Sequence, residues 1–185
     1  SMKFDPFATL LIGKDVNDMA SISLCLITKD SARVLTQCLV SISEAIDELI
    51  VADLGSQDET RKIALNFGAR WFEPEQKTDR CAAQNFALHQ AKCDYLMWMH
   101  PEDRLKPDDL KRFCDLKRQL CPGITGVSMH YMLADEKCAP NPAPSPCFLA
   151  RRDAHPLWRA SGYGTLDYEG YTLFSDLTLC RAVSP

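Results

Sequence analysis

Short apolar segments alternate along the chain with longer segments whose apolar residues recur at helical spacing. The apolar, β-branched segment Ile22–Ile27 predicts a buried strand. Further strands are predicted where similar segments recur, or where apolar and polar residues alternate, at Glu48–Asp53, Ala69–Glu73, Tyr95–Met99 and Val127–Leu133. The segment 139–146 holds four prolines and predicts a loop, and beyond Arg151 the pattern weakens.

Each of the helices predicted between these strands has a start signal in the sequence. Three of the starts have a side chain that can accept hydrogen bonds from free amides, at Asp30 or Ser31, at Ser56, and at Thr78 or Asp79. The fourth has a proline that suits a first turn, Pro107. Ser56 and Glu59 form a capping-box pattern. The helix they open is predicted to run to Phe67, and Gly68 to supply its left-handed end.

Alternating strands and helices predict an α/β fold with a mainly parallel sheet and right-handed crossovers. Ligands of such sheets bind outside the carboxyl ends of the strands. Three polar clusters directly follow predicted strands, at 28–30, 53–56 and 100–103. These clusters are therefore the candidates for a binding site.

Each candidate side chain has a functional and a structural interpretation. Asp53 could bind a base or ribose, or could satisfy the amides of its own turn. Arg80, at a predicted helix start, could pair with a phosphate, or could be a solvated surface charge. The cluster of His100, Glu102 and Asp103 could hold a divalent cation, or could be a polar loop that Pro101 sets apart from its strand.

Composition limits the class of protein. A length of 185 residues suits one domain, which we predict over residues 21–185 after a weakly patterned N-terminal extension over residues 1–20. Apolar runs are far shorter than a spanning helix needs, and the segment 7–12 lacks the flanks of a signal peptide, so we expect a cytoplasmic protein without a transmembrane segment. Basic residues are scattered in a chain of net charge −4, which argues against nucleic acid as a partner.

The nine cysteines include no C-x-x-C spacing, so neither a zinc ribbon nor a thioredoxin-like site is expected. Several lie on apolar faces, where a free thiol packs as a small hydrophobic group. We therefore expect reduced thiols and no disulfide.

Several of these segments, taken together and in order, resemble the family-2 glycosyltransferases. The segment 22–30 is similar to the first strand and turn of that family, and 38–42 to the helix that follows. Asp47–Thr60 resembles its strand-D-x-G-S-x-D-x-T segment, Ala82–Asn85 its A-A-R-N, with glutamine in place of arginine, and Asp94–Met99 the strand before its D-x-D. The resemblance implies a GT-A fold, a mixed and mainly parallel sheet flanked by helices, with a nucleotide sugar at the strand ends.

Carried over by position, the resemblance implies roles for individual residues. Thr28, Lys29 and Asp30 would line the nucleoside pocket, Asp53 would bind the base or ribose, and Arg80 would lie near the diphosphate.

The chain departs from the family at the D-x-D motif, where it has His100-Pro101-Glu102, followed by Asp103. Imidazole suits transition metals better than magnesium, so a divalent cation held by His100, Glu102 and Asp103 would be Mn²⁺ rather than Mg²⁺. The family also places an acidic base beyond the sheet. Asp167 is the candidate for that base, and a turn aspartate is the alternative.

The resemblance implies an inverting transfer of a sugar from a UDP- or GDP-linked donor to a carbohydrate or lipid-linked acceptor. The alternative is a catalytically degenerate GT-A domain that binds nucleotide or serves as an interaction module. A nucleotidyltransferase on a similar sheet is a third possibility. It would need a glycine-rich basic loop after the first strand, and residues 28–33 contain no glycine.

Overall fold

The computed structural model describes residues 19–75, 77–133, 147–159 and 165–181. The predicted loop at 139–146 lies outside these ranges. The division into an extension over residues 1–20 and a domain over 21–185 stays a prediction, because residues 1–18 are also outside them.

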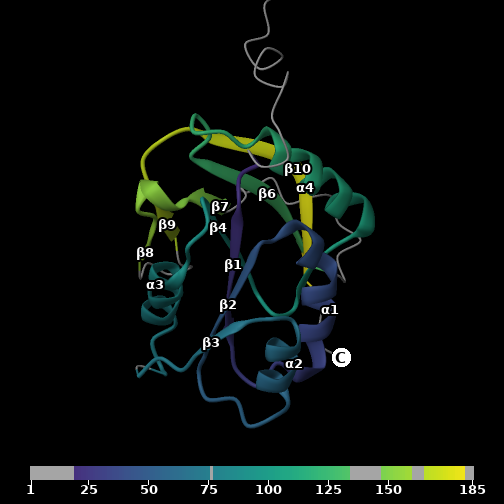
Figure 1. The fold of residues 1–185 in the computed structure, drawn as a ribbon, viewed down its shortest axis with the longest axis vertical. Helices are drawn as coiled ribbons and strands as arrows, with labels where there is room; N and C mark the ends of the chain where they lie inside the picture. The colour runs from purple at the N-terminus through teal and green to yellow at the C-terminus, as the bar shows by residue number, and fades with distance from the viewer. Residues whose placement is uncertain (1–18, 76, 134–146, 160–164, 182–185) are drawn as a thin grey trace, which may run out of the picture.

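An eight-stranded mixed sheet, in the order β3-β2-β1-β4-β7-β6-β10-β5, forms the centre of the described structure (Figure 1). Strands β1, β2, β3 and β4 are mutually parallel, while β7 runs antiparallel to both of its neighbours. A separate two-stranded hairpin is formed by β8 and β9. The strands are β1 (Ile22–Thr28), β2 (Glu48–Asp53), β3 (Arg70–Phe72), β4 (Tyr95–Met99), β5 (Asp103–Leu105), β6 (Gly126–Leu133), β7 (Cys147–Arg151), β8 (Leu157–Arg159), β9 (Thr165–Asp167) and β10 (Thr172–Arg181).

In the ranges that the structure describes, four α-helices and two short 3-10 helices connect the strands. They are α1 (Ala32–Ile42), η2 (Ser43–Ala45), α2 (Thr60–Asn66), α3 (Arg80–Gln90), α4 (Pro107–Gln119) and η3 (Arg152–Ala154). The predicted α/β architecture is confirmed. The strands predicted before residue 134 all exist, whereas β5, β7, β8, β9 and β10 were not predicted.

The sheet buries a different set of side chains on each face. On one face, Leu24, Val51 and Met97 belong to a large core that includes residues of α1, α2 and α4. On the other face, Cys25 and Trp98 belong to a smaller core built on the alanines of α3 and on the hairpin. Figure 1 shows the same division, with α3, β8 and β9 on the left and α1, α2 and α4 on the right.

The helix starts follow the sequence in three cases and differ in one. Helix α1 begins at Ala32, directly after the predicted Ser31, although the Ser31 side chain forms no cap hydrogen bond. Asp79 caps α3, since its carboxylate accepts a hydrogen bond from the Ala82 amide at 2.9 Å, and Pro107 occupies the first turn of α4. The predicted capping box at Ser56 and Glu59 does not form, because Ser56 is held by residues of β2 and of the turn after β1. Helix α2 begins at Thr60 instead, with no side-chain cap.

In the part of the chain that the structure describes, no helix has the length and apolar character required to cross a bilayer. Seven cysteines in the same ranges are free thiols, at positions 25, 38, 81, 93, 114, 121 and 180.

Candidate functional site

The carboxyl ends of β1, β2 and β4 meet at one edge of the sheet. In the parallel register Thr28 lies beside Asp53, and Leu26 beside Met99, so the chain leaves β4 at His100 next to the ends of the other two strands. The structure therefore brings the three predicted polar clusters to one edge, at the lower end of β1 in Figure 1.

Asp53 organises the turn that follows β2. Its carboxylate accepts hydrogen bonds from the Thr28 hydroxyl at 2.7 Å, the Gly55 amide at 2.9 Å, and both the amide and the hydroxyl of Ser56 at 2.7 and 2.5 Å. The residue is only 2% exposed. Both carboxylate oxygens are thus occupied by protein donors, which is the geometry of a turn aspartate.

The turn after β1 is joined to the turn after β2. Asp30 adopts a left-handed conformation, with φ of 47°. Its amide donates to the Ser56 hydroxyl at 2.8 Å, and its carboxylate accepts from the Gln57 amide at 2.6 Å. These two hydrogen bonds fix Asp30 at the edge, and its side chain remains about half exposed.

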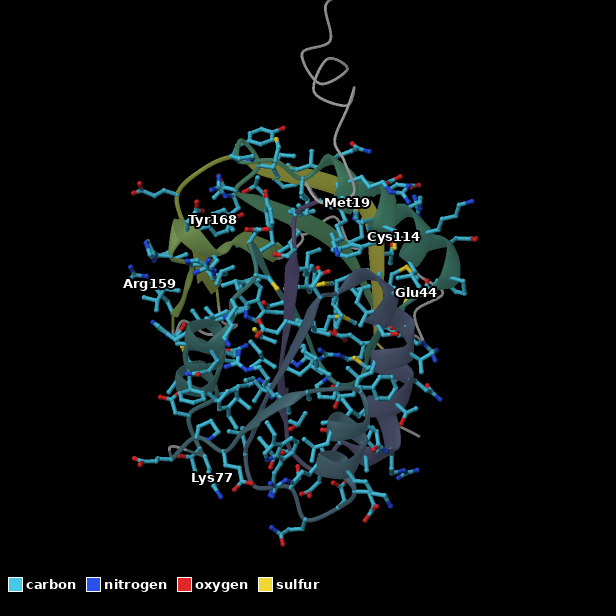
Figure 2. The ribbon with its side chains drawn as sticks, viewed as in Figure 1. Met19, Glu44, Lys77, Cys114, Arg159 and Tyr168 are labelled. Carbon is cyan, nitrogen blue, oxygen red and sulfur yellow. The ribbon has the colours of Figure 1, made fainter. Side chains whose placement is uncertain are left out.

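Two ammonium groups converge on Gly55. Lys29 donates a hydrogen bond to the Gly55 carbonyl oxygen. A Cβ placed on Gly55 would lie 3.7 Å from Lys29 Nζ and 3.6 Å from Lys77 Nζ. Figure 2 labels Lys77 at the same lower end of the molecule. The edge therefore carries positive charge beside the Asp53 turn.

Arg80 and His100 form a close pair across this edge. Arg80 Nη2 lies 2.7 Å from His100 Nδ1, which joins the first residue of α3 to the residue after β4. Burial, followed by the Arg181 guanidinium, lowers the pKa of His100 from its ordinary value, so the imidazole is neutral at pH 7. Burial also lowers the pKa of Arg80, although a guanidinium remains charged at that pH.

Asp103 is fully buried behind this pair. One of its oxygens accepts from the Tyr131 hydroxyl at 2.8 Å and from Arg181 Nε at 3.1 Å, and the other accepts from the His100 amide at 2.8 Å. The Arg181 guanidinium also lies over the Tyr131 ring, 5.2 Å from its centroid. The Asp103 carboxylate therefore ties the loop after β4 to β6 and β10.

The β8–β9 hairpin lies against α3 and β4. The Asn85 side chain forms hydrogen bonds with both backbone groups of Trp158, and the Trp158 ring contacts Trp98 of β4 edge-on at 5.6 Å. Asp167 lies on β9, where it forms an ion pair with Arg159 and is largely exposed. Figure 2 labels Arg159 on this side of the molecule.

Comparison with known proteins decides the family. Residues 23–158 match the sequence model of Glycosyl transferase family 2. The chain belongs to this family. Family-2 membership agrees with the polar edge described above, and the GT-A fold expected from the resemblance is confirmed by solved structures.

Two solved structures illustrate the similarity in fold. S. aureus TarS 1–349, solved in complex with UDP-GlcNAc, superposes with a TM-score of 0.68 at 13% identity, over 89% of this chain and 59% of that one. Glucosyl-3-phosphoglycerate synthase from Mycobacterium tuberculosis, solved with Mn²⁺, UDP and phosphoglyceric acid, gives 0.64 at 20% identity, over 94% and 76%.

A curated relative shares more sequence over a shorter segment. The TPR repeat-containing protein Synpcc7942_0270 of Synechococcus elongatus is 37% identical over 102 residues, which are 55% of this chain. The chain spans 25% of the length of that relative and 60% of the chain in another TarS 1–349 structure.

The predicted metal ligands do not fit a divalent cation in the family-2 position. Asp103 has both oxygens engaged and buried, and His100 uses Nδ1 for Arg80. Only Glu102 is left, and in the described ranges no three His, Cys, Asp or Glu side chains converge to hold a metal ion. The structure does not bring His100, Glu102 and Asp103 together as a ligand set.

Sequence reasoning missed the roles of Asn85, Tyr131 and Arg181. Asn85 had a signal, since it occupies the last position of the segment similar to A-A-R-N. Tyr131 was predicted as a strand residue without a site role, and Arg181 lies where the sequence pattern had weakened. Tyr131 and Arg181 lie 28 and 78 residues from Asp103 in the sequence, so no local pattern could reveal their hydrogen bonds with it.

Proposed function

We propose that this family-2 domain binds a UDP- or GDP-linked sugar at the edge formed by β1, β2 and β4, and transfers the sugar to a carbohydrate or lipid-linked acceptor with inversion. The observation that supports the proposal is the family match over residues 23–158, which includes every residue of this edge. Ligands of open α/β sheets bind at this end of the strands.

The residues of the edge take different parts in this proposal. Thr28, Lys29 and Asp30 line the nucleoside pocket, and Arg80 faces the diphosphate, where a guanidinium binds phosphate oxygens with paired hydrogen bonds. Asp53 contributes by holding the turn at Gly55 and Ser56, since its own oxygens are already occupied. This support for the turn replaces the direct contact with base or ribose that the resemblance implied.

Transfer with inversion requires a base near the acceptor. The acceptor hydroxyl attacks the anomeric carbon from the face opposite the diphosphate, and a carboxylate takes its proton. Asp167 is our candidate for that carboxylate, because it pairs with Arg159 and is accessible on the hairpin that packs against β4.

A second candidate function is nucleotide binding without turnover. It is favoured by the motif after β4, where His100 replaces a carboxylate and Asp103 is committed to Tyr131 and Arg181. Such a domain would recognise a nucleotide sugar, or act as an interaction module, and release no product.

A nucleotide panel tests both candidates. Thermal unfolding is measured with uridine and guanosine mono- and diphosphates and with their diphosphosugars, each with and without Mn²⁺. A ligand at 100 times its Kd stabilises the fold by about 2.7 kcal/mol, so a UDP or GDP compound should raise the unfolding temperature measurably. Release of nucleoside diphosphate from the sugar donor then separates transferase from binding module. If no nucleotide shifts the transition, the nucleotide-binding proposal is wrong.

A further inference from the structure

The hydrogen bond between Arg80 and His100 fixes where the imidazole carries its proton. A guanidinium has only donors, so Arg80 Nη2 at 2.7 Å requires that His100 Nδ1 accept. A neutral imidazole with an accepting Nδ1 has its proton on Nε2. His100 therefore presents an N–H donor at its other ring nitrogen.

This arrangement leaves no lone pair on the imidazole for a metal ion. A metal binds a neutral imidazole through an unprotonated ring nitrogen, and that nitrogen is already bonded to Arg80. The neighbouring carboxylate of Asp103 is taken by Tyr131, Arg181 and the His100 amide. A cation at this place would have to break bonds to Arg80 and to the Asp103 cluster at once.

The same arrangement suits an anion. Arg80 forms no salt bridge with a carboxylate in the described ranges, in contrast to Arg70, Arg112, Arg151 and Arg159. Part of the Arg80 side chain is exposed, and in the described ranges its guanidinium forms no hydrogen bond other than the one to His100, so its remaining N–H groups can bind a ligand. Held at the start of α3 by His100, the guanidinium and the imidazole offer fixed donors at the strand edge, where phosphate oxygens are good acceptors.

We propose that this domain binds the diphosphate of its nucleotide without a divalent cation, through the guanidinium of Arg80 and the Nε2–H of His100. The inference rests on the proposed nucleotide binding and specifies how one part of the ligand is held. His100 is then a diphosphate-binding residue that replaces a metal-binding carboxylate.

Calorimetry of UDP and GDP, in excess EDTA and in excess Mn²⁺, tests the proposal. We expect the wild-type Kd to be the same in both conditions within about threefold. Arg80→Gln should weaken diphosphate binding roughly tenfold or more in EDTA, the fold-change expected for a lost charge-assisted hydrogen bond. Binding of the matching nucleoside, uridine or guanosine, should not change. Arg104→Gln is the control, because the Arg104 side chain is exposed and in the described ranges forms a hydrogen bond only with Gln37.

His100→Asp provides a second, independent readout. An aspartate beside Arg80 neutralises the guanidinium, so diphosphate binding in EDTA should fall, and Mn²⁺ should now restore it. Nitrogen NMR of the wild-type imidazole should show the Nε2–H form. Binding by the wild type that requires Mn²⁺, or unchanged binding by Arg80→Gln, would overturn this inference and leave nucleotide binding in place. No binding of either nucleotide in either condition would overturn both.

Discussion

Asn85 forms two hydrogen bonds with the backbone of Trp158, a residue 73 positions further along the chain. Its Nδ2 donates to the Trp158 carbonyl oxygen at 3.0 Å, and its Oδ1 accepts from the Trp158 amide at 2.8 Å. The side-chain amide thus forms the pair of hydrogen bonds that a neighbouring strand would otherwise form with β8. This pair fastens the hairpin that carries Asp167 to α3, the helix that begins with Arg80.

We expect Asn85→Ala to lower the free energy of unfolding by about 1–3 kcal/mol, because the half-buried Trp158 amide loses its side-chain partner and the Trp158 carbonyl keeps only the weak Cys81 thiol donor. Urea denaturation measures the change. Asn66→Ala is the matched control, since Asn66 is exposed at the end of α2, and should change stability by less than about 0.5 kcal/mol. Equal effects of the two substitutions would show that the Asn85 amide does not hold the hairpin.

Asp53→Ala should remove four hydrogen bonds from the turn after β2 and destabilise the fold by about 2 kcal/mol or more. Nucleotide affinity should fall with it, by more than about 1 kcal/mol, because Gly55 and Ser56 lose their support. Urea denaturation and calorimetry on the same variant measure both quantities. Asp115→Ala, which removes an exposed ion pair with Arg118, serves as the control. Lost affinity at unchanged stability would instead indicate a direct contact between Asp53 and the ligand.

Gly126 lies where Tyr168 covers the start of β6. A Cβ at Gly126 would lie 2.3 Å from Tyr168 Oη and 2.6 Å from Cζ, so Gly126→Ala should cost about 1–3 kcal/mol of stability by overpacking. Gly123→Ala should cost much less, because its Cβ would meet only Cys121 Sγ, at an ordinary 3.9 Å. In a Tyr168→Ala background the cost of Gly126→Ala should largely disappear. A cost that persists there would point to the backbone of Gly126 rather than to the Tyr168 ring.

The cysteines should differ in reactivity according to burial. Cys25 and Cys38 are each 1% exposed, and burial raises the pKa of both thiols far above the usual range. Alkylation of the native protein should therefore modify them roughly tenfold or more slowly than the half-buried Cys93 and Cys121. Peptide mass analysis without reductant measures this and also detects any disulfide. Rapid labelling of Cys25 or Cys38 would contradict the packing of α1 or α3 on the sheet.

Much of the fold is local in origin and was therefore predictable. The segments Ile22–Thr28 and Tyr95–Met99 are buried throughout and apolar except at Ser23 and Thr28, because parallel strands in the centre of a sheet are covered on both faces. Asp79 and Pro107 marked the starts of α3 and α4 correctly, since helix capping depends on residues within one turn. The polar residues that follow β1, β2 and β4 lie at one edge because these strands are parallel, as the alternation of strands and helices had predicted.

The α/β pattern, the family resemblance and the residues at the strand edge follow from the sequence alone. How those residues are used depends on contacts between distant segments of the folded chain. Ser56 has the sequence signal of a helix cap, yet its hydroxyl and amide donate to Asp53, a buried carboxylate whose burial is costly without hydrogen-bond donors. His100 and Asp103 have the spacing of metal ligands, yet their hydrogen-bonding atoms are taken by Arg80, Tyr131 and Arg181 from distant segments. A donor or acceptor can form hydrogen bonds with only a few partners, and packing across the whole chain decides which partners lie within reach.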